Sequence, residues 1–345
     1  MKPYAALALQ LPARSVENAA DPRAQMIAHI GKVATKLLSS AMFVQQYSGS
    51  PVKLVVLPEY LFSSFPGRVS IPDFAAKVAW DVDGVEYDAL GEVAQDQGLF
   101  LAGNAYETDA HFPELYFQTS FVIAPSGDVV LRYRRLNSMY APTPHDVWDK
   151  YLGIYGIDGV FPVARTEIGN LAAIASEEIL YPEIARAHAL RGAEVFVHSS
   201  SEIGSPIKTP KMIAKQARAF ENIAYVVSAN TAGIIGTNGC AQSADGNSMV
   251  VDYKGNVMAE SNAGETFTAF ADIDVDALRS ARRKPGMTNV LSRQRTELFA
   301  STYATGSHQQ ANALLEVDVV KTPDRDHFNR VQAETLERLA KDGLI

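Results

Sequence analysis

Short, predominantly apolar segments alternate with amphipathic segments along the first hundred residues, and this alternation constrains the fold more than any other feature. Residues 4–10, 52–57 and 99–102 are apolar runs of strand length. Such runs are typical of strands that are buried on both faces of a sheet. Between them, apolar residues recur at helical spacing over 26–38, in a helix predicted to stop near Gly49 and Pro51, and over 85–97. Because a sheet buried on both faces needs covering layers, the pattern predicts an α/β protein.

The middle of the chain adds three predicted hairpins to this pattern. Residues 116–124 and 128–134 flank Pro125-Ser126-Gly127, a typical turn sequence. Further hairpins are predicted around 167–170 and between 249–252 and 256–260. Hairpins add antiparallel strands to crossover units, so we expect a sandwich with mixed sheets. Helices are predicted over 182–191 and 211–222, and strands over 171–175, 194–198 and 224–229.

The periodic pattern weakens after residue 283, which divides the chain into a predicted main domain, 1–283, and a C-terminal extension, 284–345. The extension contains a polar stretch at 307–310 and a charged one at 324–326, and only 333–344 keeps helical periodicity. It is too polar to form a core of its own. We therefore expect it to take part in oligomer contacts, by crossing onto a partner subunit.

Charge favours a small molecule as the partner. The chain has 31 Lys and Arg against 39 Asp and Glu, a net charge of −8, which disfavours a nucleic-acid surface. No stretch approaches 18 apolar residues, and the apolar run at the N-terminus ends at Pro12, so no membrane partner is predicted. The single cysteine, Cys240, cannot form an internal disulfide, and this favours a cytoplasmic location.

No cofactor or metal is predicted, because the chain lacks the GxGxxG, HExxH and CxxC motifs and its seven histidines are scattered. Instead, polar residues follow three predicted strands. Glu59 comes directly after the strand 52–57, Arg135 ends the second strand of a hairpin, and Ser176 lies between the strand 171–175 and a helix. Ligands of α/β sheets bind at such carboxyl ends. Taken singly, Glu59 is typical of a solvated carboxylate, Arg135 of a surface charge and Ser176 of a helix cap.

Taken together, these segments resemble the nitrilase superfamily of carbon–nitrogen hydrolases, most closely its amidase-like branch. The resemblance extends over residues 4–275. It implies a four-layer αββα sandwich and an acyl-enzyme mechanism for linear amides, as well as a homodimer or higher homo-oligomer paired through the helices 182–191 and 211–222. The residues that carry it are Pro58-Glu59-Tyr60, Tyr133-Arg134-Arg135, Ser176 to Glu183, Gly192 to Val195, Ala217 to Asn222 and Ser228 to Gly233.

Two positions depart from the family pattern. Ser176 occupies the position of the catalytic cysteine, and Arg135 that of the catalytic lysine. A serine hydroxyl is a weaker nucleophile than a thiolate, so the substitution is expected to impair the enzyme. Arginine keeps its proton and can act only electrostatically, with the backbone N–H of Glu177, on an oxyanion. Glu59 occupies the position of the general base.

The resemblance also suggests auxiliary residues. Asp146 is the candidate for a further carboxylate that orients water or substrate. Candidate pocket residues are Tyr60, Tyr140, Trp148 and Ser200. Three functions remain open: a carbon–nitrogen hydrolase impaired by Ser176, a natural non-catalytic binding or assembly protein, and a serine-dependent amidase or esterase.

Overall fold

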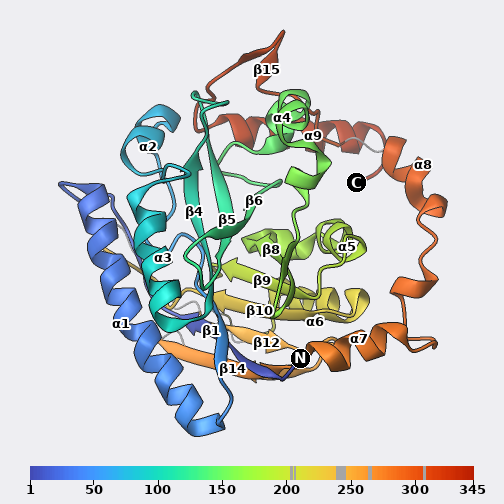
Figure 1. Ribbon diagram of the computed structural model, residues 1–345. Helices are drawn as coiled ribbons and strands as arrows, with labels where there is room; N and C mark the ends of the chain where they lie inside the picture. Colours follow the sequence, from blue (N-terminus) through green and yellow to red (C-terminus); the bar gives the residue numbers. More distant parts are fainter. Residues whose placement is uncertain (203–204, 206, 238–245, 263–265, 306–307) are drawn as a thin grey trace.

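The apolar runs form the centres of two sheets that pack face to face in the computed structural model, with helices on both outer faces (Figure 1). The structure describes the chain except residues 203–204, 206, 238–245, 263–265 and 306–307. The predicted four-layer αββα sandwich is confirmed. Cys240 lies outside the described residues.

The first sheet has six strands, of which the central three run parallel. β1 pairs with β3 and β3 with β4 in parallel, while β14, β5 and β6 join antiparallel to their neighbours. In the pair of β1 with β14, Tyr4 lies opposite Ile273 at one end and Gln10 lies opposite Phe267 at the other. In spatial order the strands are β14 (Phe267–Ile273), β1 (Tyr4–Gln10), β3 (Val52–Val56), β4 (Phe100–Thr108), β5 (Tyr116–Ile123) and β6 (Val129–Arg134).

The second sheet repeats this arrangement with a parallel centre of β8, β9 and β10. Antiparallel hairpin partners flank it on both sides. In spatial order the strands are β13 (Val257–Glu260), β12 (Met249–Val251), β10 (Tyr225–Asn230), β9 (Val195–Ser200), β8 (Gly169–Ala175) and β7 (Ala164–Thr166). Two short pairs lie outside the sheets: β2 (Ala13–Arg14) with β11 (Ile234–Ile235), and β15 (Leu315–Glu316) with β16 (Val319–Val320).

Alternate side chains of each strand divide the apolar core into layers, because successive residues of a strand face opposite sides. Ala6 and Leu54 face the second sheet, while their neighbours Leu7 and Val55 face the outer helices. α1 (Pro22–Ser48), α2 (Ile71–Lys77) and α3 (Val85–Gln97) cover the first sheet. α5 (Pro182–Leu190) and α6 (Pro210–Asn222) cover the second.

The three predicted hairpins are confirmed. Gly127 and Gly169 supply positive φ angles of 91° and 119° at two of the turns. The predicted helices and central strands agree with the structure to within a few residues at most ends, and α1 ends at Ser48, beside the predicted stop at Gly49. The exceptions are β4, which continues to Thr108, and α9, which begins at His327. Sequence periodicity did not indicate α2, α4 (Trp148–Val160), α7 (Val275–Arg283) or α8 (Glu297–Thr305), nor the short helices η1 (Pro144–Val147) and η3 (Leu291–Arg293).

The C-terminal segment runs from α7 along one side of the molecule to α8 and then crosses behind α4 as α9 (His327–Lys341) (Figure 1). It packs against its own chain. Leu314 and Val320 join a small apolar cluster with Phe112 and Tyr151. Nη1 of Arg325 donates hydrogen bonds to the Tyr116 hydroxyl and the Tyr140 carbonyl, both at 2.8 Å. Contact with a partner subunit stays a prediction for this segment.

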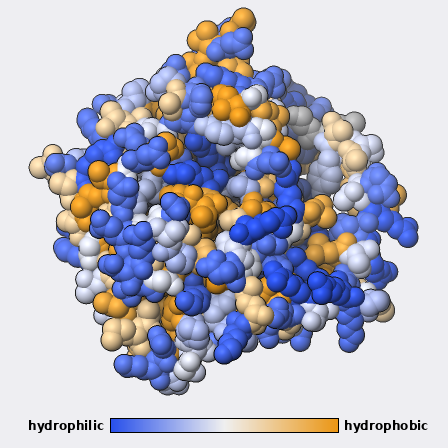
Figure 2. Space-filling view, viewed as in Figure 1, coloured by the Kyte–Doolittle hydropathy of each residue, from blue (hydrophilic) through white to orange (hydrophobic). Residues whose placement is uncertain are grey.

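Polar side chains cover most of the face seen in Figure 2, and apolar ones are interspersed in small groups. Leu190 of α5 and Ile213 and Phe220 of α6 are exposed on the outside of the second sheet. Within the described part of the chain, no helix combines the length and the apolar character that crossing a membrane requires.

Candidate active site

The carboxyl ends of four strands meet at one edge of the sandwich and bring the candidate residues together. Glu59 follows β3 and Arg135 follows β6 in the first sheet, while Ser176 follows β8 and Ser200 ends β9 in the second. The backbone N–H of Glu59 donates a 3.3 Å hydrogen bond to the Ser200 carbonyl, which joins the two sheets at this edge. All four residues are buried.

Glu59 and Arg135 form a buried ion pair. Nη1 of Arg135 lies 3.2 Å from Oε1 of Glu59, and the Gln118 side-chain amide donates to the same oxygen at 2.8 Å. Gln118 also accepts from Nη1 of Arg135 at 2.6 Å and donates to the Asn104 side chain at 3.0 Å. The Glu59 carboxylate is therefore fixed by two donors from neighbouring strands of the first sheet.

The remaining nitrogens of Arg135 also have protein partners. Nε donates to the Asn137 carbonyl at 2.6 Å, and Nη2 forms an ion pair with the Glu177 carboxylate. Burial alone lowers the pKa of Arg135, but the carboxylates of Glu177 and Glu59 outweigh it and raise the pKa above its ordinary value. Arg135 thus keeps its charge and links carboxylates from both sheets.

Glu178 holds the loop that carries Arg135. Its Oε1 accepts from the backbone N–H groups of Leu136 and Asn137 at 2.7 and 2.9 Å, and its Oε2 accepts from the Tyr133 hydroxyl at 2.7 Å. Burial raises the pKa of Glu178 to about 7, although the charge of Arg135 and these hydrogen bonds oppose the shift. Glu178 positions the loop after β6, a role that the sequence alone did not indicate.

Ser176 occupies a strained turn between β8 and the short helix η2 (Ser176–Leu180). Its φ angle is 50°, in the left-handed region that is unfavourable for residues other than glycine. The N-cap residue of η2 is Ala175, and no side chain caps the helix. Ser176 therefore does not act as the helix cap that its type alone suggests. A strained residue at a strand-to-helix turn is typical of nucleophiles at the edge of a sheet.

His198 fixes this turn from the neighbouring strand. Its Nε2 lies 2.8 Å from the Ser176 carbonyl oxygen, and its Nδ1 lies 2.8 Å from the Ser228 hydroxyl. Burial lowers the pKa of His198 well below its usual range, and the charges of Lys215 and Lys211 add to the shift. The ring is thus neutral. Because a carbonyl can only accept, Nε2 carries the proton and Nδ1 accepts from Ser228.

Lys211, in the first turn of α6, reaches the hydroxyl of Ser176. Its Nζ lies 3.3 Å from Ser176 Oγ and 3.5 Å from Ser200 Oγ. This contact was not predicted from the sequence, where Lys211 belongs only to a helix expected to pair subunits. One local signal was available: the first turn of a helix carries partial positive charge, so a lysine there conflicts with the helix dipole.

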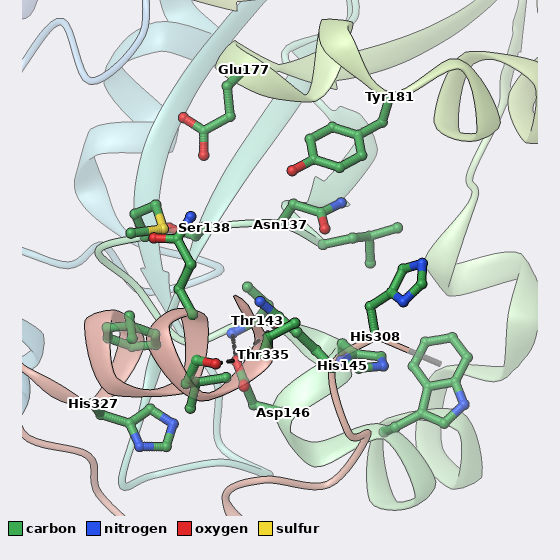
Figure 3. A pocket seen from close by; sticks show the side chains of 17 residues that line it. Asn137, Ser138, Thr143, His145, Asp146, Glu177, Tyr181, His308, His327 and Thr335 are labelled. Atoms are coloured by element: carbon green, nitrogen blue, oxygen red, sulfur yellow. Dashed lines mark hydrogen bonds between the residues drawn. The ribbon is translucent and has the colours of Figure 1, made fainter. Parts of the chain in front are cut away.

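A cavity of about 520 Å³ adjoins this edge of the sandwich (Figure 3). Glu177 and Tyr181 lie on one side, and Thr143, Asp146 and Thr335 of α9 lie on the other. The lining mixes polar and apolar side chains, namely Leu136, Asn137, Ser138, Met139, Thr143, His145, Asp146, Trp148, Glu177, Tyr181, His308, Gln309, His327, Phe328, Val331, Gln332 and Thr335. The C-terminal segment thus supplies one wall of the cavity.

The auxiliary candidates occupy different places. Asp146 and Trp148 line the cavity, and the Asp146 carboxylate accepts from the Thr143 N–H and hydroxyl at 2.8 and 2.9 Å. Burial raises the pKa of Asp146. Neither Tyr60 nor Tyr140 lines the cavity. Tyr60 packs edge-on against Phe65, and Tyr140 is 63% exposed.

Comparison with known proteins settles the family. The family model for carbon–nitrogen hydrolases matches residues 22–283. The chain belongs to this family. The match covers both sheets except β1, together with their covering helices, and it includes Glu59, Arg135 and Ser176.

Curated relatives of this family member include amidases of two kinds. A formamidase from Pseudomonas syringae pv. tomato is 27% identical over 242 residues, which cover 70% of this chain and 66% of the relative. An omega-amidase from Mus musculus is 25% identical over 264 residues, covering 76% of this chain and 90% of the relative. The chain thus spans slightly less than two thirds of the formamidase it matches.

Solved structures of nitrilase-superfamily proteins share the fold. A carbon–nitrogen hydrolase from Helicobacter pylori superposes with a TM-score of 0.64 at 19% identity, covering 87% of this chain and 98% of its own. A superfamily member from Saccharomyces cerevisiae gives 0.61 at 19% identity, with coverages of 83% and 96%. An amidase from Nesterenkonia sp. gives 0.59 at 20% identity, with coverages of 87% and 96%.

Proposed function

We propose that this carbon–nitrogen hydrolase cleaves small linear amides through an acyl-enzyme formed at position 176. The observation that carries the proposal is the strained turn at Ser176, which presents its hydroxyl at the strand ends beside Glu59 and Arg135. Relatives named as formamidases and an omega-amidase support linear amides as the substrate class. The cavity beside Glu177 is the proposed site for the acyl group.

The contacts support distinct roles for the surrounding groups. The first N–H groups of a helix have no partner within it, so the N–H of Glu177 in η2 is the proposed donor to the oxyanion of the tetrahedral intermediate. The nitrogens of Arg135 are engaged with Glu59, Glu177, Gln118 and Asn137. We assign Arg135 to holding the two carboxylates, which is narrower than the oxyanion role implied by the resemblance.

Replacement of Ser176 tests this function. A thiol beside the Lys211 ammonium is readily ionised and is intrinsically more nucleophilic than a hydroxyl. Ser176→Cys should therefore raise ammonia release from formamide, acetamide and dicarboxylic acid monoamides by about 100-fold or more. Ser176→Ala should abolish release. Intact-protein mass spectrometry should detect the acyl adduct of the cysteine variant.

A matched control separates the effect of position 176 from that of a new thiol. Ser39→Cys places a cysteine on the exposed side of α1 and should leave ammonia release at the native level. If Ser176→Cys gives neither ammonia nor an adduct across the panel, the hydrolase proposal fails. Calorimetric binding of the same amides to the native protein would then favour the non-catalytic binding protein.

A further inference from the structure

Lys211 meets the nucleophile position with an amine that is not held in an ion pair. Besides the hydroxyls of Ser176 and Ser200, its Nζ contacts the Ser201 carbonyl at 3.5 Å. Among the residues that the structure describes, no carboxylate lies within ion-pair distance of this amine. The side chain is half-buried. Its proton is therefore not retained by a fixed negative charge.

We propose that Lys211 takes the proton of Ser176 when the serine attacks the acyl carbon, so that the two residues form a serine–lysine nucleophile pair. This inference rests on the proposed function, since it requires position 176 to be the nucleophile. Lysine serves as the base for a serine nucleophile in hydrolases of other folds. The pair would make the serine a working nucleophile, although a slower one than a cysteine at the same position.

Glu59 is less well placed for this step. A general base must lie within hydrogen-bonding reach of the proton that it removes. Its Oε1 already accepts from Gln118 and Arg135, and no hydrogen bond joins Glu59 to Ser176, both of which the structure describes. Lys211 meets the distance requirement at 3.3 Å.

Positive charge is concentrated around Lys211. The N-terminus of α6 places partial positive charge next to it. One turn further along the helix, burial lowers the pKa of Lys215 to about 8, and the charge of Lys211 adds to that shift while Glu202, 3.8 Å from Lys215, opposes it. The neutral ring of His198 faces the same corner.

The proposed step balances as follows. Ser176 Oγ bonds to the carbonyl carbon, its proton moves to neutral Nζ, and the carbonyl electron pair moves to oxygen. When the oxyanion collapses, the C–N bond breaks and Nζ gives the proton to the departing amine. Water then transfers a proton to Nζ and attacks the ester. The second collapse releases the acid and returns the proton to Ser176 Oγ.

Labelling with a fluorophosphonate tests the pair without an amide substrate. Ser176 Oγ would bond to phosphorus, fluoride would leave, and Lys211 would take the proton. We expect the native protein to be labelled at Ser176, as located by peptide mass spectrometry, and Ser176→Ala to remain unlabelled. The labelling rate should rise with pH because only the neutral amine accepts a proton.

Two substitutions separate proton transfer from charge. Lys211→Met removes both, whereas Lys211→Arg keeps the charge but accepts no proton near neutral pH. Each should lower the labelling rate by about 100-fold or more, which is the usual contribution of a general base, and abolish its rise with pH. Lys36→Met, at an exposed lysine of α1, is the matched control and should label at the native rate.

Three results would overturn the pair: an unlabelled native protein, a native rate and pH profile in Lys211→Arg, or a larger loss of labelling in Glu59→Gln than in Lys211→Met. Amide hydrolysis by Ser176→Cys, measured in parallel, distinguishes the two proposals. If that variant hydrolyses amides while native labelling fails, only the pair is wrong. If both fail, the proposed function is wrong as well.

Discussion

The two sheets contribute opposite kinds of chemistry to the site. From the first sheet, Glu59 and Arg135 form a network in which charged groups pair with each other and with side-chain amides. From the second sheet, the Ser176 and Ser200 hydroxyls surround the Lys211 ammonium, which has no carboxylate partner among the described residues. The first group is held together by opposite charges, whereas the Lys211 amine of the second contacts only neutral oxygens.

The two groups of residues should therefore respond differently to substitution. Removing one member of a buried ion pair leaves its partner uncompensated in a medium of low polarity, so the first group resists change. An amine among hydroxyls can lose its proton without leaving an unpaired charge behind. The arrangement thus places an amine without a carboxylate partner beside the proposed nucleophile and an ion-pair network on the opposite sheet.

The largest expected effect on stability comes from removing Arg135 from the network with Glu59 and Glu177. Arg135→Met removes the cation between Glu59 and Glu177 and should lower the free energy of unfolding by about 3–5 kcal/mol, because two carboxylates lose their partner. Urea denaturation followed by fluorescence measures the change. Lys211, which is half-buried and has only neutral partners, provides the comparison. Lys211→Met should lower the free energy of unfolding by less than about 1 kcal/mol.

Arg135→Lys refines this test. It keeps the charge but loses the planar fork that reaches two carboxylates and the Asn137 carbonyl, so its destabilisation should fall between the native protein and Arg135→Met. Equal stability of Arg135→Met and the native protein would show that the first group does not hold the site together.

A second effect, on the order of 3 kcal/mol, concerns the pH dependence of stability through Glu178. The pKa of this carboxyl is raised from 4.5 to about 7 by burial in the folded protein. Between these values the folded state keeps a proton that the unfolded state releases. The stabilisation is thus complete below pH 4.5 and is lost as the pH rises through about 7.

Glu178→Gln isolates this contribution. The amide does not titrate, so urea denaturation across this pH range should give a smaller decline in stability for the variant than for the native protein. Identical slopes in the two proteins would contradict the raised pKa.

The smallest expected effect concerns the wall of the cavity. Phe328 of α9 is 7% exposed and lines the cavity. In the Ser176→Cys background, Phe328→Ala should raise KM for the best amide by about 5- to 10-fold with kcat retained, since about 1 kcal/mol of apolar contact is lost. Leu336→Ala, at a half-exposed position of the same helix, is the control and should leave KM unchanged. An unchanged KM in Phe328→Ala would exclude this wall from substrate binding.

Local sequence patterns predicted the sandwich because its strands and hairpins are encoded by adjacent residues. Apolar runs identified β1 and β3, and turn residues identified the β5–β6 hairpin. α4 was not predicted, since Gly156, at φ 60° and ψ 179°, interrupts its helical course. The polar C-terminal segment gave little periodicity, because it packs through isolated side chains such as Leu314 and Phe328.

The candidate site was predictable only in part. Strand ends and the family resemblance indicated Glu59, Arg135 and Ser176, which lie at one edge of the sandwich. Lys211 is 35 residues from Ser176 along the chain, and its contact depends on how α6 crosses η2. The buried role of Glu178 likewise depends on the loop after β6, from which Leu136 donates to it. Such contacts are set by tertiary packing, on which spacing along the chain carries no information.

The hydrogen bonds between the two sheets have a consequence for access to the site. Ser199 Oγ donates to the Leu57 carbonyl at 2.7 Å, Glu59 N–H donates to Ser200, and Tyr133 donates to Glu178. Each bond joins one sheet to the other at the edge where the candidate residues lie. The two sheets cannot separate at this edge unless these hydrogen bonds break. An incoming molecule must therefore reach the site past the loops that surround this edge. Because loops vary more than sheets do, this route can differ between relatives that share the fold.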